Sequence, residues 1–459
     1  MLKIYDSLSK QKKEFKPVVP GQVSIYVCGN TVYDHCHIGH ARSMIIFDTI
    51  TRYLRSQDYK VTYVRNITDI DDKIIHRANE NGETCDALTT RYIKAQGENE
   101  VSLGIASPDH EPKATEYVSQ IIKLIETIID NGHAYVADNG DVCFEVRSQE
   151  GYGKLSHRNV DDLRSGVRVE IGETKRDPLD FVLWKMSKPE EPSWDSPWGK
   201  GRPGWHIECS AMSSELLGQP FDIHGGGLDL KFPHHENEIA QSEAACKKDF
   251  ANYWMHVGLL QINKEKMSKS LGNFFTINEV LEKHHFEVVR YFMLSSHYRS
   301  PINYSEENLS QMCHSLERLY TAIRGLPDVE PLQQHHFTDA FNAAMNDDFN
   351  TPEALAVFFE MVREINKLRN DGKNDEAARL ASTLKTLAVS FGILQQDPET
   401  FLQGELGDVD ASKIDAMIIA RDKARQEKQW EEADRIRDEL KAMSIIIEDG
   451  ASGVRWRKE

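Results

Sequence analysis

A four-residue motif, His37-Ile38-Gly39-His40, stands between an expected strand and an expected helix. Alternating apolar residues from Val23 to Val27 indicate the strand, and the apolar spacing of residues 42–54 indicates a buried helix. A turn between a strand and a helix N-terminus binds phosphate groups, because backbone N–H groups and the helix dipole point toward it. The motif therefore favours an α/β fold with a nucleotide site near the start of the chain.

A second motif, Lys266-Met267-Ser268-Lys269-Ser270, lies in a polar stretch far along the chain. Its two lysines are three residues apart among small residues, which suits a loop that closes positive charge over a developing pyrophosphate. Taken alone, the histidines could be a capped surface turn and the lysines a solvated loop. Their occurrence together, in this order, favours an adenylate-forming site.

The seven cysteines include no close Cys-x-x-Cys pair, which argues against a disulfide framework and for a reducing compartment. Cys28 ends the first expected strand, at the edge where open α/β sheets bind ligands, and Cys209 is the second candidate ligand. If the stretch after the glycine run is helical, His234 and Glu238 lie one turn apart and could bind one ion or form a solvated surface pair. The four side chains together would make a sulfur, nitrogen and oxygen set suited to zinc.

These motifs resemble the class I aminoacyl-tRNA synthetases, and within that class the cysteinyl-tRNA synthetase family. The resemblance covers nearly the whole chain and implies that Cys28, Cys209, His234 and Glu238 hold one zinc ion in the active site. The segments most similar to the family's sequence blocks are residues 27–29, 66–73, 205–210 and 224–230.

The resemblance implies a ligase that activates L-cysteine with ATP to cysteinyl-adenylate and transfers it to the terminal ribose of tRNA(Cys). Serine and cysteine differ by one atom, so a shaped pocket would discriminate them weakly. A thiolate binds zinc and a hydroxyl hardly does, so zinc would select cysteine without an editing domain. Four protein ligands usually mark a closed structural site. The substrate must therefore add as a fifth ligand or displace one, and Glu238 is expected to loosen first.

Roles for further residues follow from the same resemblance, all by positioning and charge rather than covalent chemistry. Magnesium would enter with the ATP. The implied sites are His37, His40, Lys266 and Lys269 for catalysis; Gly39, His40, Asp229 and Lys269 for ATP; and Cys28, Thr68, Trp205 and His224 for the cysteine pocket.

At 459 residues the chain is too long for a single core. We expect a Rossmann-like α/β nucleotide-binding catalytic domain with an insertion, followed by an α-helical bundle and a small C-terminal anticodon-binding domain. The sheet should resume at Trp205 and run to about Ile262, and from Ser305 onward helix should replace strand. The expected boundaries are 1–115 for the first half of the catalytic domain, 116–201 for an insertion near the acceptor end, 202–262 for the second half, 263–304 for the signature loop and stem-contact region, 305–395 for the helical bundle, and 396–459 for the linker and anticodon-recognition module.

The net charge of -18 is unlike that of a protein that grips RNA, because phosphate neutralisation needs Lys and Arg. Residues 413–459 differ from the rest, since their 11 Lys and Arg balance 11 Asp and Glu. This tail could present a basic face or form a salt-bridged helix. Trp430 could stack on a base or pack in a core. By resemblance, Arg425, Trp430 and Asp434 are candidate anticodon contacts.

The chain has no membrane-spanning apolar run and no signal-peptide core, so we expect a cytoplasmic protein with no membrane contact. We also expect a monomer whose partners are tRNA(Cys), ATP and L-cysteine. Two alternatives remain. A cysteine-activating amino-sugar ligase would share the core but need no anticodon module. A non-catalytic, zinc-bearing RNA-binding protein would have lost histidines or lysines from the two motifs, and all of these are present.

Overall fold

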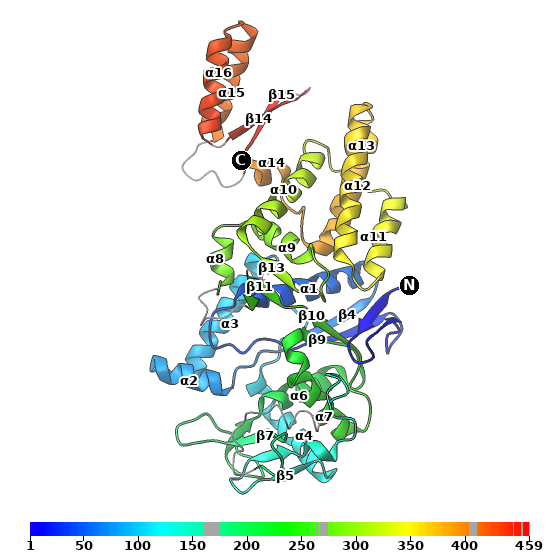
Figure 1. Ribbon diagram of the computed structural model, residues 1–459, viewed down its shortest axis with the longest axis vertical. Helices are drawn as coiled ribbons and strands as arrows, with labels where there is room; N and C mark the ends of the chain where they lie inside the picture. Colours follow the sequence, from blue (N-terminus) through cyan, green and yellow to red (C-terminus); the bar gives the residue numbers. More distant parts are fainter. Residues whose placement is uncertain are drawn as a thin grey trace. The chain divides into compact units, whose positions relative to one another are not determined.

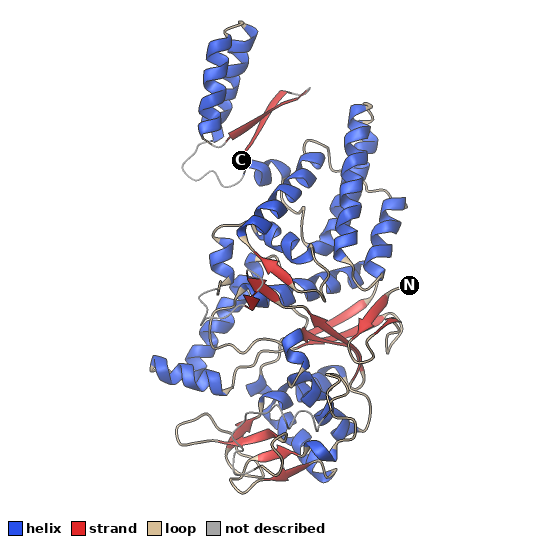
Figure 2. Ribbon diagram, viewed as in Figure 1, coloured by secondary structure: helices blue, strands red, loops and turns tan. Residues whose placement is uncertain are grey.

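The computed structural model describes residues 1–159, 175–262, 265–266, 274–403, 411–443, 445–450 and 453–458. The chain divides into two compact units, whose helices and strands are labelled in Figure 1 and coloured by type in Figure 2. The first unit comprises Met1–Leu309, Thr338–Ala356 and Ser390–Gly392, and the second comprises Ser310–Phe337, Val357–Val389 and Ile393–Glu459.

A four-stranded parallel sheet with the order β10-β9-β3-β4 positions the site in the first unit. Helix α1 (Ile38–Ser56) connects β3 to β4 and buries its apolar residues. The strand and the buried helix expected around the first motif are therefore confirmed. Because the strands are parallel, the carboxyl ends of β3, β4 and β9 lie at one edge of the sheet. The strands are β3 (Gln22–Val27), β4 (Lys60–Arg65), β9 (Phe221–Gly227) and β10 (Ala251–Val257).

Two further strands and two helices belong to the part of the chain that precedes the insertion. An antiparallel pair, β1 with β2, precedes the parallel sheet, and two helices, α2 and α3, follow β4. Their bounds are Lys3–Asp6 for β1, Gln11–Glu14 for β2, Asp72–Asn81 for α2 and Cys85–Ser102 for α3.

The segment between the two halves of the parallel sheet forms a four-stranded antiparallel sheet with the order β5-β6-β7-β8. Helix α4 contributes Ile121 and Ile125 to a core shared with Phe144 and Trp184 from the strands. The elements are η1 (Ala114–Tyr117), α4 (Val118–Asp130), β5 (Ala134–Val136), β6 (Val142–Phe144), η2 (Val146–Ser148), β7 (Phe181–Met186) and β8 (Gly201–Pro203).

The expectation that the sheet resumes at Trp205 is wrong, because Trp205 begins the helix α6 (Trp205–Leu217) and the sheet resumes only at β9. A short apolar run does not distinguish a buried strand from a buried helix, and α6 has buried residues on nearly all its faces. A turn of 3-10 helix, η3 (Leu228–Lys231), and α7 (His234–Cys246) follow β9. Helix α7 packs against α6, so the two helices that follow the insertion form one layer beside the sheet.

From Ser305 onward helices predominate, as expected. A small sheet of order β12-β11-β13 and two short helices precede them. The linker expected at the start of residues 396–459 contains a helix, α14. The bounds are β11 (Leu260–Ile262), β12 (Glu265–Lys266), α8 (Ile277–Leu281), α9 (Phe286–Leu294), β13 (Ile302–Tyr304), α10 (Glu306–Ile323), α11 (His336–Asn346), α12 (Thr351–Asn370), α13 (Asn374–Ala388), η5 (Val389–Phe391) and α14 (Pro398–Gln403).

The chain ends in a small module, which we call the C-terminal module, formed by the described residues from 411 to 458. It contains helices α15 (Ala411–Gln426) and α16 (Trp430–Ala442) and an antiparallel hairpin of β14 (Ile445–Gly450) and β15 (Gly453–Lys458). The prediction that helix replaces strand from Ser305 onward does not hold at this end, where the apolar run Ile445–Ile447 forms a strand that contributes Ile445 to the core. Trp456 lies in this core, whereas Trp430 is 59% exposed. The hypothesis that Trp430 packs in a core is therefore wrong.

Replacing Trp456 by alanine should destabilise the C-terminal module, because its indole is buried and donates a hydrogen bond to Asp415 Oδ1 at 2.8 Å. Removing a buried Trp side chain costs about 3–5 kcal/mol, so amide hydrogen exchange in α15 and α16 should accelerate strongly. Trp430→Ala removes the same side chain from the surface and should leave exchange nearly unchanged. Equal acceleration in the two variants would contradict the placement of Trp456 in the core.

Candidate active site

The first motif forms the N-terminus of α1, directly after the end of β3. His37 is the N-cap, and its Nδ1 accepts hydrogen bonds from the backbone N–H groups of Gly39 at 3.1 Å and His40 at 3.3 Å. The backbone N–H of His37 in turn donates to His40 Nδ1 at 3.2 Å, and the two rings stack with centroids 3.5 Å apart. Burial, with a smaller contribution from His37, lowers the pKa of His40 to about 3. His40 is therefore a neutral imidazole at a helix N-terminus.

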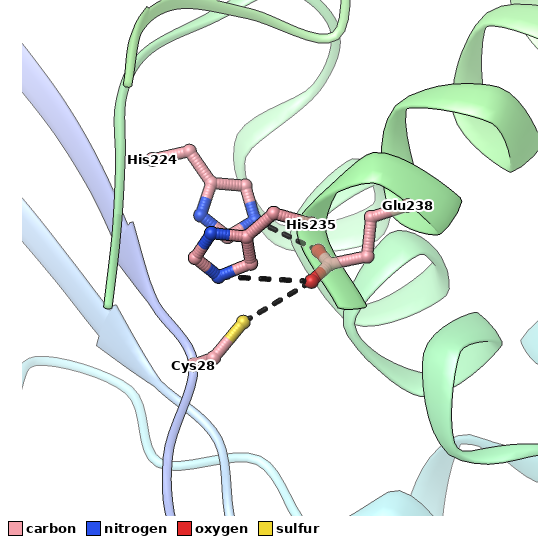
Figure 3. A group of neighbouring side chains, drawn as sticks. All are labelled: Cys28, His224, His235 and Glu238. Atoms are coloured by element: carbon pink, nitrogen blue, oxygen red, sulfur yellow. Dashed lines mark hydrogen bonds and ion pairs between the residues drawn. The ribbon is translucent and has the colours of Figure 1, made fainter. Parts of the chain in front are cut away.

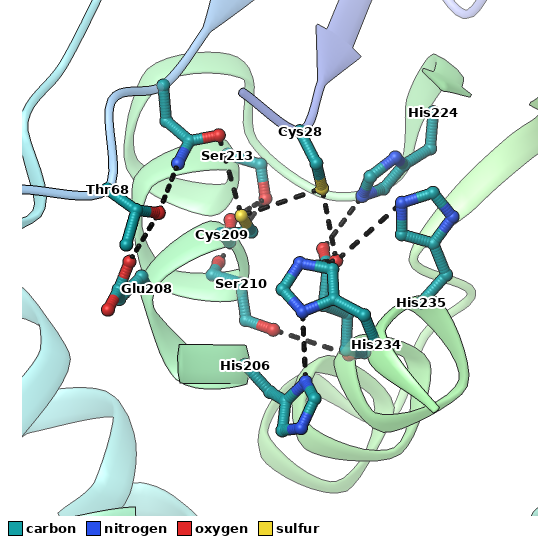
Figure 4. A network of polar contacts seen from close by, with 12 residues as sticks. Cys28, Thr68, His206, Glu208, Cys209, Ser210, Ser213, His224, His234 and His235 are labelled. Carbon is teal, nitrogen blue, oxygen red and sulfur yellow. Dashed lines mark hydrogen bonds and ion pairs between the residues drawn. The ribbon is translucent and has the colours of Figure 1, made fainter. Parts of the chain in front are cut away.

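The four expected metal ligands lie together, at the same edge of the parallel sheet as this helix N-terminus. Their donor atoms are all within 4.8 Å of one another. Cys28 Sγ lies 3.5 Å from Cys209 Sγ (Figure 4) and 3.3 Å from Glu238 Oε1 (Figure 3). His234 Nε2 lies 3.0 Å from the same oxygen. Cys28 follows β3, Cys209 is on α6, and His234 and Glu238 are one turn apart on α7. The structure thus brings four possible metal ligands from three separate segments into one buried cluster.

The protonation of these groups is coupled. Burial opposes the charge on Glu238, but His224 and His234 hold the pKa of this carboxyl well below its usual value. Burial likewise opposes a charge on His234, yet Glu238 and Cys209 raise its pKa to about 10. Burial raises the pKa of Cys209, but the hydrogen bond with Cys28 and the nearby His234 together lower this pKa to about 6. Burial and the neighbouring Cys209 and Glu238 raise the pKa of Cys28. The charged groups therefore compensate one another in a space closed to water.

A second set of donors shares two residues with the first. Cys28, His224, His235 and Glu238 also present atoms within 4.8 Å of one another (Figure 3). His224 Nε2 lies 2.7 Å from Glu238 Oε2, while His235 Nε2 is 4.0 Å from Glu238 Oε1. His235 Nδ1 lies 2.9 Å from His256 Nε2. His224 and His235 are therefore suited to orient Glu238 from outside the first donor set, because metal ligands are normally held in place by contacts with neighbouring groups.

Sequence analysis missed several residues of this region. His206 Nδ1 lies 2.9 Å from His234 Nδ1, which leaves His234 Nε2 facing Glu238. His235 could have been noticed because it adjoins His234, and His206 because it falls in a segment similar to the family. His256 on β10 carries no local signal at all, because only the order of the strands brings it next to α7.

Among the residues expected in the cysteine pocket, Trp205 is 38% exposed, and its ring centroid lies 4.3 Å from that of His234. Thr68 is buried after the end of β4, and its hydroxyl donates to Glu208 Oε2 at 3.0 Å. His224 is fully buried and stacks on Trp254 with centroids 4.5 Å apart. The fourth expected pocket residue, Cys28, belongs to the metal set.

The remaining candidate residues that the structure describes lie on η3, in β12 and in the C-terminal module. Asp229 is an exposed residue of η3, directly after the carboxyl end of β9. The backbone of Lys266 belongs to β12 and pairs with Gln261, but its side chain, and all of Lys269, lie outside the described residues. In the C-terminal module, Arg425 is in the last turn of α15, and Trp430 begins α16.

Ion pairs run along α16. Asp434 pairs with Arg437 at 3.0 Å, and Arg435 pairs with Glu432 at 2.7 Å and Glu439 at 3.3 Å. The hypothesis of a salt-bridged helix is therefore confirmed for α16. None of the described helices is long and apolar enough to cross a membrane.

Comparisons with known proteins cover almost every part of the chain. The family described as tRNA synthetases class I (C) catalytic domain matches residues 14–314, the DALR domain matches 340–395, and the cysteinyl-tRNA ligase anticodon binding domain matches 411–457. The chain is 59% identical to the cysteine–tRNA ligase of Coxiella burnetii strain RSA 493 over 458 residues, with 100% of both chains covered. It is 60% identical to that of Pseudomonas aeruginosa strain PAO1 over 458 residues, covering 100% of this chain and 99% of the relative.

Solved structures share the fold at low identity. Mycobacterium tuberculosis methionyl-tRNA synthetase in complex with methionyl-adenylate matches with a TM-score of 0.56 and 16% identity, over 81% of this chain and 89% of that one. Agrobacterium radiobacter K84 agnB2 LeuRS, in a ternary complex with tRNA, matches with a TM-score of 0.59 and 12% identity, over 82% and 85%. The catalytic fold is thus that of class I synthetases.

Cobalt binding should distinguish the two donor sets, because one contains two thiols and the other only one. Co²⁺ added to the full-length protein should give a thiolate-to-metal absorption band that both Cys28→Ser and Cys209→Ser weaken. Cys246→Ser, which changes an exposed cysteine of α7, is the matched control and should leave the band unchanged. A band that is lost in Cys28→Ser but intact in Cys209→Ser would assign the metal to His224 and His235 instead.

Proposed function

Because the chain belongs to the cysteinyl-tRNA ligase family of class I synthetases, we propose that it joins L-cysteine to tRNA(Cys). Cysteine first reacts with ATP to give cysteinyl-adenylate and pyrophosphate, and the cysteinyl group then passes to the terminal ribose of the tRNA. The observation that carries the proposal is the cluster of Cys28, Cys209, His234 and Glu238, at the same edge of the parallel sheet as the N-terminus of α1. The cluster supports a thiol-binding site at the same edge of the sheet as the proposed nucleotide site.

Zinc fits the cluster by the chemistry of its donors, which are two thiols, an imidazole and a carboxylate, all shielded from water. When bound, zinc supplies a soft centre that takes a thiolate in preference to a hydroxyl, which separates cysteine from serine. The burial of these residues excludes water from the selection step. Thr68 and Trp205 border the same space and shape the cysteine pocket, and His224 orients Glu238 from behind.

The nucleotide is held at the N-terminus of α1. Gly39 and His40 meet the phosphates there, and His37 fixes the turn. Asp229, at the end of β9, contacts the ribose, and Mg²⁺ accompanies the ATP. Lys266 and Lys269 supply the positive charge that stabilises the departing pyrophosphate.

The tRNA is recognised by a separate part of the chain. The C-terminal module reads the anticodon through Arg425, Trp430 and Asp434, which is supported by the match of residues 411–457 to an anticodon binding domain. The insertion at residues 116–201 contacts the acceptor end. We propose that the protein is a monomer and acts in the cytoplasm.

Neither alternative function gains support. An amino-sugar ligase would not require the C-terminal module, yet residues 411–457 match an anticodon binding domain, and relatives match over the full length. A non-catalytic RNA-binding protein would not need an intact nucleotide site, yet His37 and His40 form a complete capped helix N-terminus.

Lys269→Ala should lower the rate of cysteine-dependent pyrophosphate exchange about a hundredfold or more, because charge on the departing pyrophosphate matters most in the transition state. The KM for cysteine should change far less. Lys283→Ala, which removes an exposed lysine from the same unit, is the control and should retain the full rate. Equal losses in rate and in cysteine binding would instead assign the loop a structural role.

Trp430→Ala should lower the rate of tRNA charging about tenfold through loss of a stacked base, which is worth about 1–3 kcal/mol. Pyrophosphate exchange without tRNA should be unaffected. Ile419→Ala, at another exposed apolar residue of the module, tests whether any surface change has this effect. Unaltered charging by Trp430→Ala would remove this indole from the anticodon site.

A further inference from the structure

Arg42 is a buried cation on α1, one turn after Ile38 of the first motif, and only 1% of its surface is exposed. Although burial lowers the pKa of its guanidinium to about 10, the group stays charged near neutral pH. Its hydrogen bonds within the described residues all go to backbone carbonyl oxygens, and none goes to a carboxylate. A buried charge is costly unless its partners are well placed. The segments that supply these carbonyl groups are therefore tied to α1.

The two shortest of these bonds reach the residues that lead into β11 and β13. Nε donates to the carbonyl oxygen of Gly258 at 2.9 Å, and Nη2 donates to that of Ser300 at 2.6 Å. Gly258 lies two residues before β11 and Ser300 two residues before β13. The two strands pair in parallel, and β11 packs against α1 (Figure 1). Longer contacts, at 3.4 to 3.5 Å, reach the carbonyl groups of Met293, His297 and Tyr298.

The backbone around Gly258 is arranged so that one guanidinium can reach both segments. A Cβ on Gly258 would lie 2.4 Å from the carbonyl oxygen of Ser300, so only glycine lets the two segments approach this closely. The backbone N–H of Gly258 also donates to the carbonyl oxygen of Tyr298 at 2.8 Å. A guanidinium presents its N–H groups as a rigid planar fork, whereas a lysine ammonium is a single point of charge. Lysine would keep the charge at position 42 but could not reproduce both bonds in this geometry.

The described segments on both sides of the second motif are attached to the first two turns of α1. Strand β12, where the motif begins, pairs with β11 and so follows from the segment that Arg42 holds. Beyond the motif, the backbone N–H of Ile38 donates to the carbonyl oxygen of Phe275 at 3.0 Å, and that of Ile277 donates to Cys36 at 3.0 Å. One attachment is therefore made by the backbone of the histidine motif, and the other is made by the side chain of Arg42.

We propose that Arg42 is a positioning residue of cysteine activation, which holds the start of β11 and β13 in register with the nucleotide turn at the N-terminus of α1. It acts through the strands that lead to the lysine motif and touches no reacting group. The metal cluster is built from α6, α7 and the end of β3, so Arg42 has no part in binding the cysteine thiol. Its effect should therefore appear in the transition state, where the lysine charge matters most. The inference rests on the proposed function and adds a residue to the machinery of that reaction.

Arg42→Lys tests the inference, because it keeps the charge and loses the planar fork. In the zinc-loaded, full-length protein, this change should lower kcat of cysteine-dependent pyrophosphate exchange about 10- to 100-fold, as expected when a hydrogen bond to a charged group is lost. The KM for cysteine and the zinc content should stay nearly unchanged. Arg52→Lys makes the same substitution on the same helix, where the side chain contacts Asp48 and the carbonyl group of Gly104, and should retain the full rate. An unchanged kcat in Arg42→Lys, or a KM that rises as much as kcat falls, would overturn the inference.

A double-mutant cycle with Lys269→Ala separates positioning from a general structural role. If Arg42 acts through the lysine motif, Arg42→Lys should lower the rate of Lys269→Ala by less than about threefold, because the contribution that it positions is already gone. If Arg42 only stabilises the fold, the two losses multiply, and the inference is then wrong.

Gly258→Ala decides the question if Arg42→Lys does not fold. Its Cβ would displace the carbonyl group of Ser300 from the guanidinium while the arginine stays in place. The same fall in kcat and the same dependence on Lys269 should follow, and independent effects would count against the inference. If neither variant folds with zinc bound, Arg42 serves the stability of the fold and the inference fails. An unmodified protein that shows no cysteine-dependent exchange would count against the proposed function instead.

Discussion

The carboxylate of Glu238 joins segments that lie far apart in the chain. It is fully buried and contacts His224 from β9, Cys28 at the end of β3 and His234 one turn before it on α7. A buried carboxylate is stable only where positive or donating groups surround it, and here two histidines hold its pKa low against the effect of burial. The parallel sheet and the packing of α7 must both form before this charge is satisfied. The metal set depends on the same contacts.

The space for this cluster exists because two glycines let backbone and side chains approach closely. A Cβ on Gly29 would lie 1.7 Å from the carbonyl oxygen of Asn66, and one on Gly225 would lie 2.2 Å from the ring of Phe47. The first contact brings the ends of β3 and β4 together, and the second seats α1 against β9. Any side chain at either position would move the strand ends that carry the site. The positions of the strand ends at this edge are therefore fixed, and α6 and α7 supply the other members of the cluster there.

Local patterns predicted those parts of the molecule that depend on neighbouring residues. The first motif was predictable because strand alternation, a glycine turn and helical spacing follow one another within one short stretch. The pair His234 and Glu238 was predictable once a helix was assumed. By contrast, His256 and Arg42 matter only through packing against residues far away in the chain, and no spacing reveals such contacts. The prediction that the sheet resumes at Trp205 fails because a short apolar run fits both types of secondary structure. The family resemblance, rather than spacing, supplied the grouping of the four metal ligands.

The contacts at the N-terminus of α1 also indicate different roles for the histidine motif and the lysine motif. The N–H groups of Gly39 and His40 donate to His37 Nδ1, so a phosphate that binds them must compete with that ring. His40 is neutral, and because its Nδ1 accepts the N–H of His37, its proton sits on Nε2, where it acts as a hydrogen-bond donor. A neutral donor can orient a phosphate but cannot neutralise the charge that builds up as pyrophosphate departs. That charge must be balanced by groups outside this turn, which is the physical reason for assigning the transition-state role to the lysine motif rather than to the histidines.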